Sequence, residues 1–203
     1  MNDRQPSRSG RPRDAQIRTK VLLAAQRLYA RSGYAGVTFD ALAREAGVGK
    51  PAIYRRWDSR EELMADVLRS HELVPENPSE SGIRHNLWQI AVSTLRLVHS
   101  EQGTFLLRVS SEREWQPELF DQYFERLRTV IHFENRALVV AAIERGELSS
   151  RCDPDILIHS ITGSLLVANL MGLTPHPDAD AGAAEDYCWR LVDQVLRGVA
   201  PSA

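Results

Sequence analysis

The chain has 203 residues, of which 43% are hydrophobic and 26% are charged, which is typical of a globular protein with a substantial core. Its net charge of -2 hides an uneven distribution, because basic residues outnumber acidic ones over the first 70 positions and acidic residues prevail afterwards. A basic first third favours a polyanionic partner, with chance asymmetry on a solvated surface as the alternative.

Two further features narrow the class of protein. Cys152 and Cys188 lack the CxxC spacing, so the sequence contains no disulfide framework and no zinc motif, which suits a reducing cytoplasm. The N-terminal stretch MNDRQPSRSGRPR lacks the apolar run of a signal peptide. We therefore expect a cytoplasmic protein.

The first 13 residues are polar, basic and contain glycine and proline, a composition that predicts a disordered arm. Such an arm can enter the minor groove of DNA beside a main binding site, as the arms of homeodomains do. It can equally be a leader that touches nothing specific. The sequence leaves both alternatives open.

Four helices are predicted over the next 60 positions, residues 14–73. Apolar residues recur at helical spacing over 14–31, and Gly33 ends that helix. Thr38 is the N-cap of a second helix, FDALAREA, which Gly47 terminates. A third helix runs from residue 50 to about 57 with a proline in its first turn, and a fourth begins at the capping box SREE. Two short helices joined by a tight turn, with a longer helix in front, predict a helix-turn-helix.

The third helix is expected to have two different faces. Ile53 and Trp57 share one face and anchor the helix on its neighbours. The other face carries the lysine, tyrosine and arginines of KPAIYRR, which are common donors to phosphates and guanine edges in the major groove. A solvated basic helix is the alternative, but it explains neither the tight turn nor the flanking caps.

The remainder of the chain is predicted to be helical as well. Helical patterning resumes at Ile83, a sixth helix is expected over 103–110, and a seventh over 117–146 would be about 44 Å long at ~1.5 Å per residue. Asp153 caps an eighth helix. Several polar residues interrupt the apolar run of this helix, so we expect it to be buried in the protein and not to span a membrane. A ninth helix carries an apolar stripe over 187–196. The predicted fold class is all-α with about nine helices.

The stretch GYAGVTFDALAREAGVGKPAIYRRWDSREELMADVL resembles the N-terminal DNA-binding domain of the TetR family of bacterial transcriptional regulators. The resemblance covers residues 14–70. The features that carry it are the threonine cap, the stretch AGV, the tyrosine of the third helix and the Ser-basic-Glu-Glu-Leu start of the fourth helix. Behind the arm over 1–13, it implies a helix-turn-helix domain over 14–73 and a ligand-binding and dimerisation domain over 83–203.

The resemblance also implies a function. Members of the family bind a pseudopalindromic DNA operator as homodimers, usually repress, and release the DNA when a small-molecule effector occupies the C-terminal domain. The last two helices of each subunit pair with their mates in the dimer. A lone monomer would expose the apolar stripe of these helices, which consists of Leu165, Leu166, Leu170, Leu191 and Val195. Carried over residue by residue, the positions that touch phosphates are Thr38, Lys50, Tyr54 and Arg60. Those near base edges are Pro51, Ala52 and Arg55, and Arg56 fits either role.

Two positions depart from the family pattern. Gly49 stands where a serine or threonine commonly caps the third helix, so one phosphate-binding hydroxyl is absent and only backbone N–H groups remain. The stretch YRRW replaces tyrosine-x-histidine-phenylalanine, so Arg56 substitutes for a histidine whose charge would depend on pH.

Aromatic and polar residues behind the helix-turn-helix are candidates to line an effector cavity, although ordinary core packing explains each of them singly. These candidates are Trp88, Phe105, Arg108, Trp115, Phe124, His132 and Asn169. Scattered histidines without HExxH, and the lack of GxSxG, Walker and GxGxxG motifs, argue against an enzyme, a cofactor and a metal site. The remaining alternative is a scaffold with a vestigial helix-turn-helix, which would show no salt-dependent DNA affinity.

Overall fold

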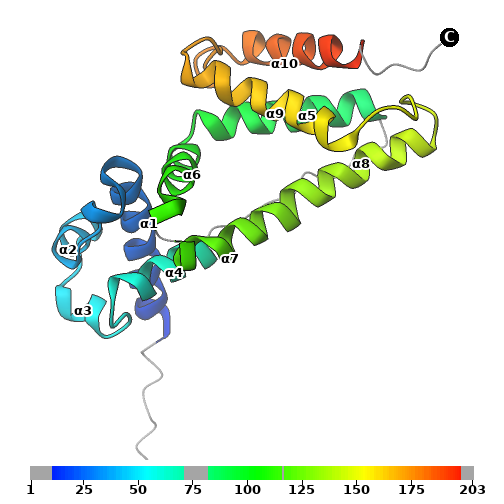
Figure 1. Cartoon of the computed structure of the whole chain (residues 1–203). Coiled ribbons are helices and arrows are strands. Elements are labelled where there is room, and N and C mark those ends of the chain that lie inside the picture. Colours follow the sequence, from blue (N-terminus) through cyan, green and yellow to red (C-terminus); the bar gives the residue numbers. More distant parts are fainter. Residues whose placement is uncertain (1–10, 71–81, 116, 198–203) are drawn as a thin grey trace, which may run out of the picture. The chain divides into compact units, whose positions relative to one another are not determined.

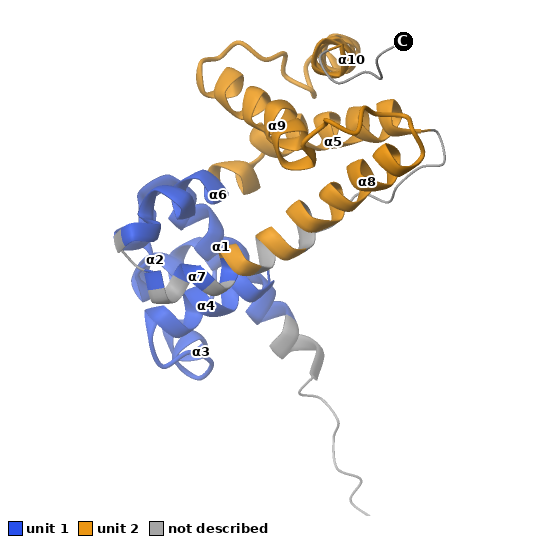
Figure 2. Cartoon of the chain, turned by 45° about the vertical axis from the view of Figure 1, so that its right-hand side comes forward, with its two compact units in different colours: residues 1–72, 105–123 blue, residues 73–104, 124–203 orange. Residues whose placement is uncertain are grey.

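The computed structural model describes residues 11–70, 82–115 and 117–197. These residues form ten α-helices and contain no β-strand, which confirms the all-α prediction (Figure 1). The chain divides into two compact units, one of residues 1–72 and 105–123 and one of residues 73–104 and 124–203 (Figure 2). The predicted arm over 1–13 lies outside the described residues except for its last three positions, which begin the first helix.

The first unit contains the four N-terminal helices and a later segment of the chain. The helices are α1 (Arg11–Gly36), α2 (Phe39–Ala46), α3 (Lys50–Tyr54) and α4 (Arg60–Ser70). The later segment comprises most of α6 (Glu101–Glu112), the short turn Arg113–Trp115 and the first part of α7 (Pro117–Leu127). Residues 105–123 therefore belong to the same compact unit as the helix-turn-helix.

The predicted caps of α2 are present. The Oγ1 atom of Thr38 accepts a hydrogen bond of 3.2 Å from the backbone N–H of Ala41. Gly47 ends the helix with a left-handed backbone at φ 64°, which glycine adopts without steric cost. Two residues then separate α2 from α3, so the turn is as short as predicted.

The third helix is shorter than predicted, since it ends at Tyr54 rather than near Trp57. The N–H of Arg56 donates to the carbonyl of Ile53 at 2.9 Å, three residues back, which tightens the chain out of the α-helix.

The capping box of α4 forms in a shifted version. The N–H of Glu62 donates to Oγ of Ser59 at 3.0 Å, as the motif requires. The carboxylate of Glu62 then accepts from the N–H of Asp58 at 2.8 Å, one residue before the expected partner.

The second unit is built from four helices that pack around one apolar core. They are α5 (Ile83–Val98), α8 (Phe133–Glu144), α9 (Pro154–Leu170) and α10 (Ala181–Leu196), and α5 lies beside both α9 and α10 (Figure 1). The cap predicted for α9 is present, because Oδ1 of Asp153 accepts from the N–H groups of Asp155 at 2.9 Å and Ile156 at 3.1 Å.

The single helix predicted over 117–146 is instead two helices, which raises the helix number from nine to ten. A π-helical turn, Arg128–His132, separates α7 from α8. The hydroxyl of Thr129 donates to the carbonyl of Glu125 at 2.9 Å, and such a bond competes with the regular backbone ladder. The apolar spacing continues through the turn, so the sequence pattern could not reveal it.

A glycine bends the end of α1 toward α6. Gly33 has φ 64° and ψ -169°, a combination that only glycine adopts without strain. The bend lets the N–H of Tyr34 donate to Oε2 of Glu112 at 3.1 Å, while the hydroxyl of Tyr29 donates to the same oxygen at 2.9 Å. A Cβ atom added at Gly33 would lie 2.2 Å from Oε1 of Glu112 and 2.8 Å from Arg108.

Replacing Gly33 with alanine should therefore lower the free energy of unfolding by about 3 kcal/mol, because backbone strain adds to the clash with Glu112. Gly47→Ala is the matched control, since Gly47 has the same φ but a Cβ atom there would meet nothing within 4 Å. The control should lose only about 1 kcal/mol in urea unfolding. Equal losses in the two variants would contradict this account of the bend.

Candidate nucleic-acid interface

One face of α3 is fixed to the first unit by apolar contacts and by a shared carboxylate. Ile53 and Trp57 are both buried, as predicted. The indole N–H of Trp57 donates to Oδ2 of Asp66 at 3.1 Å. Arg18 donates to both oxygens of the same carboxylate, at 2.7 and 3.1 Å. Asp66 therefore connects α1, α4 and the turn that follows α3.

The charge of Asp66 is stabilised by these partners. Burial by itself would raise the pKa of the Asp66 carboxyl, but the hydrogen bonds from Arg18 and Trp57 and the nearby charge of Arg69 hold the pKa below its usual value. The carboxylate is consequently ionised at neutral pH and serves as a permanent acceptor.

The opposite face of α3 is open to solvent. Its exposed residues are Lys50, Pro51, Tyr54 and Arg55, with Ala52 and Arg56 half-buried. Tyr54 is 54% exposed although its ring meets the ring of Phe39 edge-on, with centroids 4.6 Å apart. The guanidinium of Arg55 makes no hydrogen bond or ion pair with any of the described residues, so it is available to an outside partner.

Other predicted DNA contacts have partners inside the unit. The ammonium of Lys50 is paired with the carboxylate of Asp40. The guanidinium of Arg56 donates to the carbonyl of Ala52 at 2.6 Å. The hydroxyl oxygen of Thr38 accepts the cap hydrogen bond, but its proton stays available because a hydroxyl also donates.

Arg60 lies against Tyr34 at the start of α4. Its guanidinium carbon is 3.8 Å from the ring centroid, and its N–H donates to the Tyr34 carbonyl at 3.3 Å. The hydroxyl of Tyr34 donates to Glu61 at 2.6 Å. One hydrogen bond uses one of five guanidinium donors, so Arg60 retains donors for a phosphate.

Three residues at this surface were not anticipated from the sequence. Phe39 and Asp40 contact α3 from the first turn of α2, and Asp66 holds Trp57. A buried tryptophan calls for a hydrogen-bond acceptor, which is the one signal that pointed to Asp66. That signal does not say which of the many acidic residues supplies it.

The predicted effector residues are divided between the two units. In the first unit, the ring of Phe105 packs edge-on to Tyr29 with centroids 5.3 Å apart, and Arg108 pairs with Glu112 at 3.0 Å. The side chain of Trp115 lies outside the described part of the structure.

The other candidates belong to the second unit, where Trp88, His132 and Asn169 contact different neighbours. Trp88 stacks on Trp189 with ring centroids 4.9 Å apart, and the ring of His132 stacks on His159 at 5.3 Å. The side-chain amide of Asn169 donates to the carbonyl of Val98 at 3.2 Å. Phe124 is half-buried.

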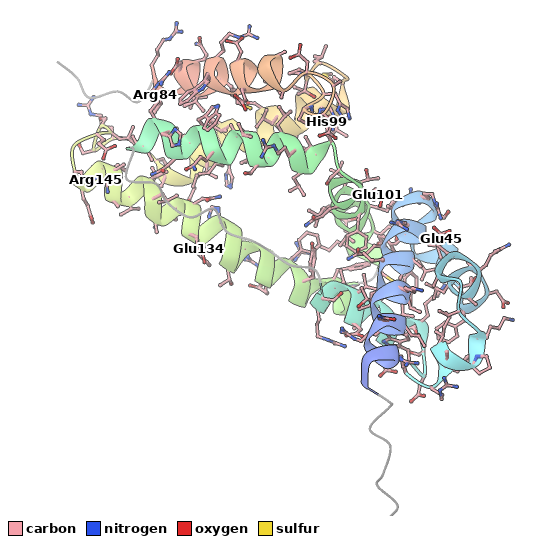
Figure 3. The ribbon with its side chains drawn as sticks, turned by 180° about the vertical axis from the view of Figure 1, so that it is seen from behind. Glu45, Arg84, His99, Glu101, Glu134 and Arg145 are labelled. Atoms are coloured by element: carbon pink, nitrogen blue, oxygen red, sulfur yellow. The ribbon has the colours of Figure 1, made fainter. Side chains whose placement is uncertain are left out.

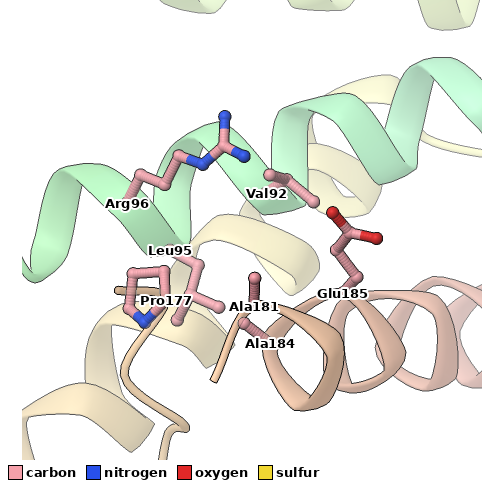
Figure 4. Close-up of a pocket in the computed structure, with 7 residues that line it drawn as sticks. All are labelled: Val92, Leu95, Arg96, Pro177, Ala181, Ala184 and Glu185. Atoms are coloured by element: carbon pink, nitrogen blue, oxygen red, sulfur yellow. The ribbon is translucent and has the colours of Figure 1, made fainter. Parts of the chain in front are cut away.

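A small cavity of about 20 Å³ in the second unit lies between α5, α10 and the loop before α10 (Figure 4). Its lining residues are Val92, Leu95, Arg96, Pro177, Ala181, Ala184 and Glu185. It has room for about one water molecule. None of the predicted effector residues lines it.

No helix in the described ranges is long and apolar enough to cross a membrane. Over the same ranges, no three histidine, cysteine or acidic side chains are grouped so that they could hold a metal ion.

A short helix anchored on one face, with basic residues on the other and a tight glycine turn before it, defines a helix-turn-helix DNA-binding protein. Residues 21–67 match the family described as bacterial regulatory proteins, tetR family. Residues 78–188 match the tetracyclin repressor-like C-terminal domain, and this second match alone covers more than half of the chain. The chain belongs to the TetR family of transcriptional regulators.

Individual relatives agree with this assignment. The chain is 26% identical to the HTH-type transcriptional regulator YdeS of Bacillus subtilis over 78% of this chain and 81% of the relative. It is 27% identical to the HTH-type transcriptional regulator Rv1556 of Mycobacterium tuberculosis over 88% of this chain and 85% of the relative. A crystal structure of a TetR transcriptional regulator from Agrobacterium tumefaciens has the same fold, with a TM-score of 0.68, 21% identity and coverage of 91% and 94%. The family and these relatives are regulators, not enzymes.

Asp66→Asn should lower the free energy of unfolding by about 2 kcal/mol at neutral pH, because it removes a charge-assisted acceptor from Arg18 and Trp57. The folded pKa of Asp66 is lowered, so its contribution is complete above the unfolded pKa of ~4 and is lost as the pH falls through the folded pKa. The difference between wild type and variant in urea unfolding should therefore shrink below about pH 4.

Asp121→Asn provides the control for this comparison. Its carboxylate pairs with Arg113 at the surface of the same unit, where an exposed pair is worth less than about 1 kcal/mol. A loss of stability in Asp66→Asn that does not depend on pH would show that the charge of Asp66 is not what holds Trp57 and Arg18.

Proposed function

We propose that this TetR-family regulator is a ligand-responsive repressor that acts in the cytoplasm and binds a pseudopalindromic DNA operator as a homodimer. The observation that carries the proposal is the two-faced α3. Ile53 and Trp57 are buried, while Lys50, Tyr54 and Arg55 face solvent. A helix held in this way presents donors to the major groove without having to rearrange.

The exposed residues suit different parts of the duplex. Arg55 has an unoccupied guanidinium, which can bond both acceptors of a guanine edge, and Pro51 and Ala52 offer small apolar surface to a thymine methyl. The residues assigned to phosphates are Thr38, Lys50, Tyr54 and Arg60, and Arg56 is assigned to either role. The phosphate contacts would fix the register of α3 and supply salt-dependent affinity.

Selection of bound fragments from a genomic DNA pool tests the proposal directly. We expect an inverted repeat whose half-site centres lie one helical turn apart, about 34 to 36 Å, or a multiple of that distance. A scaffold with a vestigial helix-turn-helix would enrich no sequence and would show no salt-dependent DNA affinity.

For the homodimer, the outer face of α9 is the proposed contact. Ile156, Val167 and Leu170 are large apolar residues exposed along that face, Leu170 to 64%. Gly163 lies on the same face, and a Cβ atom there would meet nothing within 4 Å, so a second helix can approach closely. The sequence had placed Leu165 in the contact as well, but Leu165 is fully buried in the core of its own unit.

The paired substitutions Val167→Glu and Leu170→Glu should convert a dimer into a monomer, because they bury charge in the proposed contact. Sedimentation at micromolar concentration measures the change. Leu23→Glu, at an exposed leucine of α1, is the control that should leave the dimer intact. A monomeric wild type, or a doubly substituted chain that still dimerises, would contradict the proposed contact.

Arg55→Ala and Arg60→Ala should affect DNA binding differently. Arg55→Ala should cost about 1 to 3 kcal/mol at one base pair per half-site and relax the preference there. Arg60→Ala should weaken binding to all sequences equally and reduce the slope of log K against log salt by about 0.9 per subunit. Thermal unfolding should accompany the titrations because Arg60 also contacts Tyr34. A uniform loss in Arg55→Ala would reassign Arg55 to the backbone.

We assign the effector site to the C-terminal domain. The match of this domain to the tetracyclin repressor-like C-terminal domain supports that assignment. Pockets for small molecules usually have volumes of hundreds of Å³, well above the cavity described here. An effector of that size could enter this particular cavity only if side chains around it moved. It changes DNA affinity only if it binds one arrangement of the helices better than another.

A further inference from the structure

The first turn of α2 lies against the exposed face of α3. Phe39 and Asp40 are consecutive in α2, and Lys50 and Tyr54 are one turn apart on α3. The ring of Phe39 meets the ring of Tyr54 edge-on at an angle of 84°, and the carboxylate of Asp40 pairs with the ammonium of Lys50. Two neighbouring residues of α2 thus contact the two α3 residues that we assign to phosphates.

Asp40 keeps a negative charge at this surface. Its side chain is 68% exposed and that of Lys50 is 53% exposed, so both charges face solvent. Asp40 also lies in the first turn of α2, where the helix dipole stabilises a carboxylate. The hydrogen bond to Asp40 raises the pKa of Lys50, so the ammonium of Lys50 is fully protonated at neutral pH. An ion pair this exposed contributes little to folding, so the fold does not explain it.

A DNA phosphate that approaches this pair would encounter the ammonium of Lys50 and the carboxylate of Asp40 together, and not a cation alone. The phosphate is attracted to Lys50 but repelled by Asp40, which lies beside the same ammonium. Only a cation that neutralises a phosphate releases a counterion from DNA. While Lys50 is compensated by Asp40, it adds little to that release.

We propose that Asp40 is a negative determinant of DNA affinity, which holds Lys50 in an ion pair and so limits how many phosphates each subunit neutralises. The proposal rests on the proposed function, in which α3 faces DNA. Because phosphate contacts carry no sequence information, Asp40 lowers affinity for operator and for other DNA by the same factor. It makes the complex easier to dissociate and leaves sequence preference unchanged.

Asp40→Asn in the full chain tests the proposal. The probes are the labelled duplex recovered by genomic selection and a labelled duplex of mixed sequence, each titrated over a series of salt concentrations. The variant should bind both duplexes about fivefold more tightly per subunit at low salt, as expected for removing one charge about 4 Å from another in water. Its salt slope should steepen by about 0.9 per subunit, because Lys50 now neutralises a phosphate.

Two further variants separate the ion pair from a general effect of charge. In a Lys50→Met background, Asp40→Asn should no longer steepen the salt slope. Glu45, which Figure 3 labels, provides the matched charge on α2. It pairs with Arg31 of α1 at 2.8 Å, so Glu45→Gln should have little effect. An equal gain in Glu45→Gln, or the same gain with and without Lys50, would overturn the proposal.

The outcomes also distinguish this inference from the proposed function. If the wild type prefers the selected duplex and Asp40→Asn binds it no more tightly, only the role of Asp40 is lost. If the wild type binds neither duplex and Arg55→Ala changes nothing, both the proposed function and the role of Asp40 are overturned.

Discussion

The position of α3 depends on the carboxylate of Asp66. A helix of five residues is too short to be stable by its own hydrogen bonds, so its place must come from contacts with the rest of the unit. Asp66 accepts the indole N–H of Trp57 just after α3 and the guanidinium of Arg18 on α1. Burial of Ile53 completes the attachment. One ionised carboxylate on α4 therefore holds three helices in position relative to one another. The positions of the exposed residues of α3 depend on this arrangement.

A second connection meets the same unit at Tyr34. The bend at Gly33 directs the N–H of Tyr34 to Glu112 of α6, and the Tyr34 carbonyl accepts from Arg60 at the start of α4. Burial by itself would raise the pKa of Glu112, but its hydrogen bonds to Tyr34 and Tyr29 and its pairing with Arg108 lower it. The charged side chain of Glu112, from the segment 105–123, thus helps to hold the helix-turn-helix in place. Its hydrogen bonds explain why this segment packs with the helix-turn-helix.

Local chemistry made much of the fold predictable from the sequence. The caps at Thr38, Gly47 and Asp153 depend on residues within a few positions of each other, and the structure has all three. The burial of Ile53 and Trp57 followed from helical spacing alone. The pairing of Arg18 with Asp66 was not predictable in the same way, because 48 positions separate the two residues.

Other features could not be predicted for the same reason, since they depend on which residues meet in space. Leu165 is apolar whether it faces its own core or a second copy, so the pattern could not distinguish the two. The sequence alone does not distinguish Asp40 from any other solvated acidic residue, because only the structure shows that it pairs with Lys50. The DNA contacts assigned to α3 stay predictions, since they depend on a partner that neither sequence nor fold contains.

We infer that Asp66 holds α3 in a position that suits the major groove. A crystal structure of the chain bound to its selected duplex would test this most directly. We expect α3 in the major groove, with Arg55 against a base edge and the indole of Trp57 still donating to Asp66. A complex in which α3 lies outside the groove, or in which that hydrogen bond is broken when DNA binds, would contradict the account.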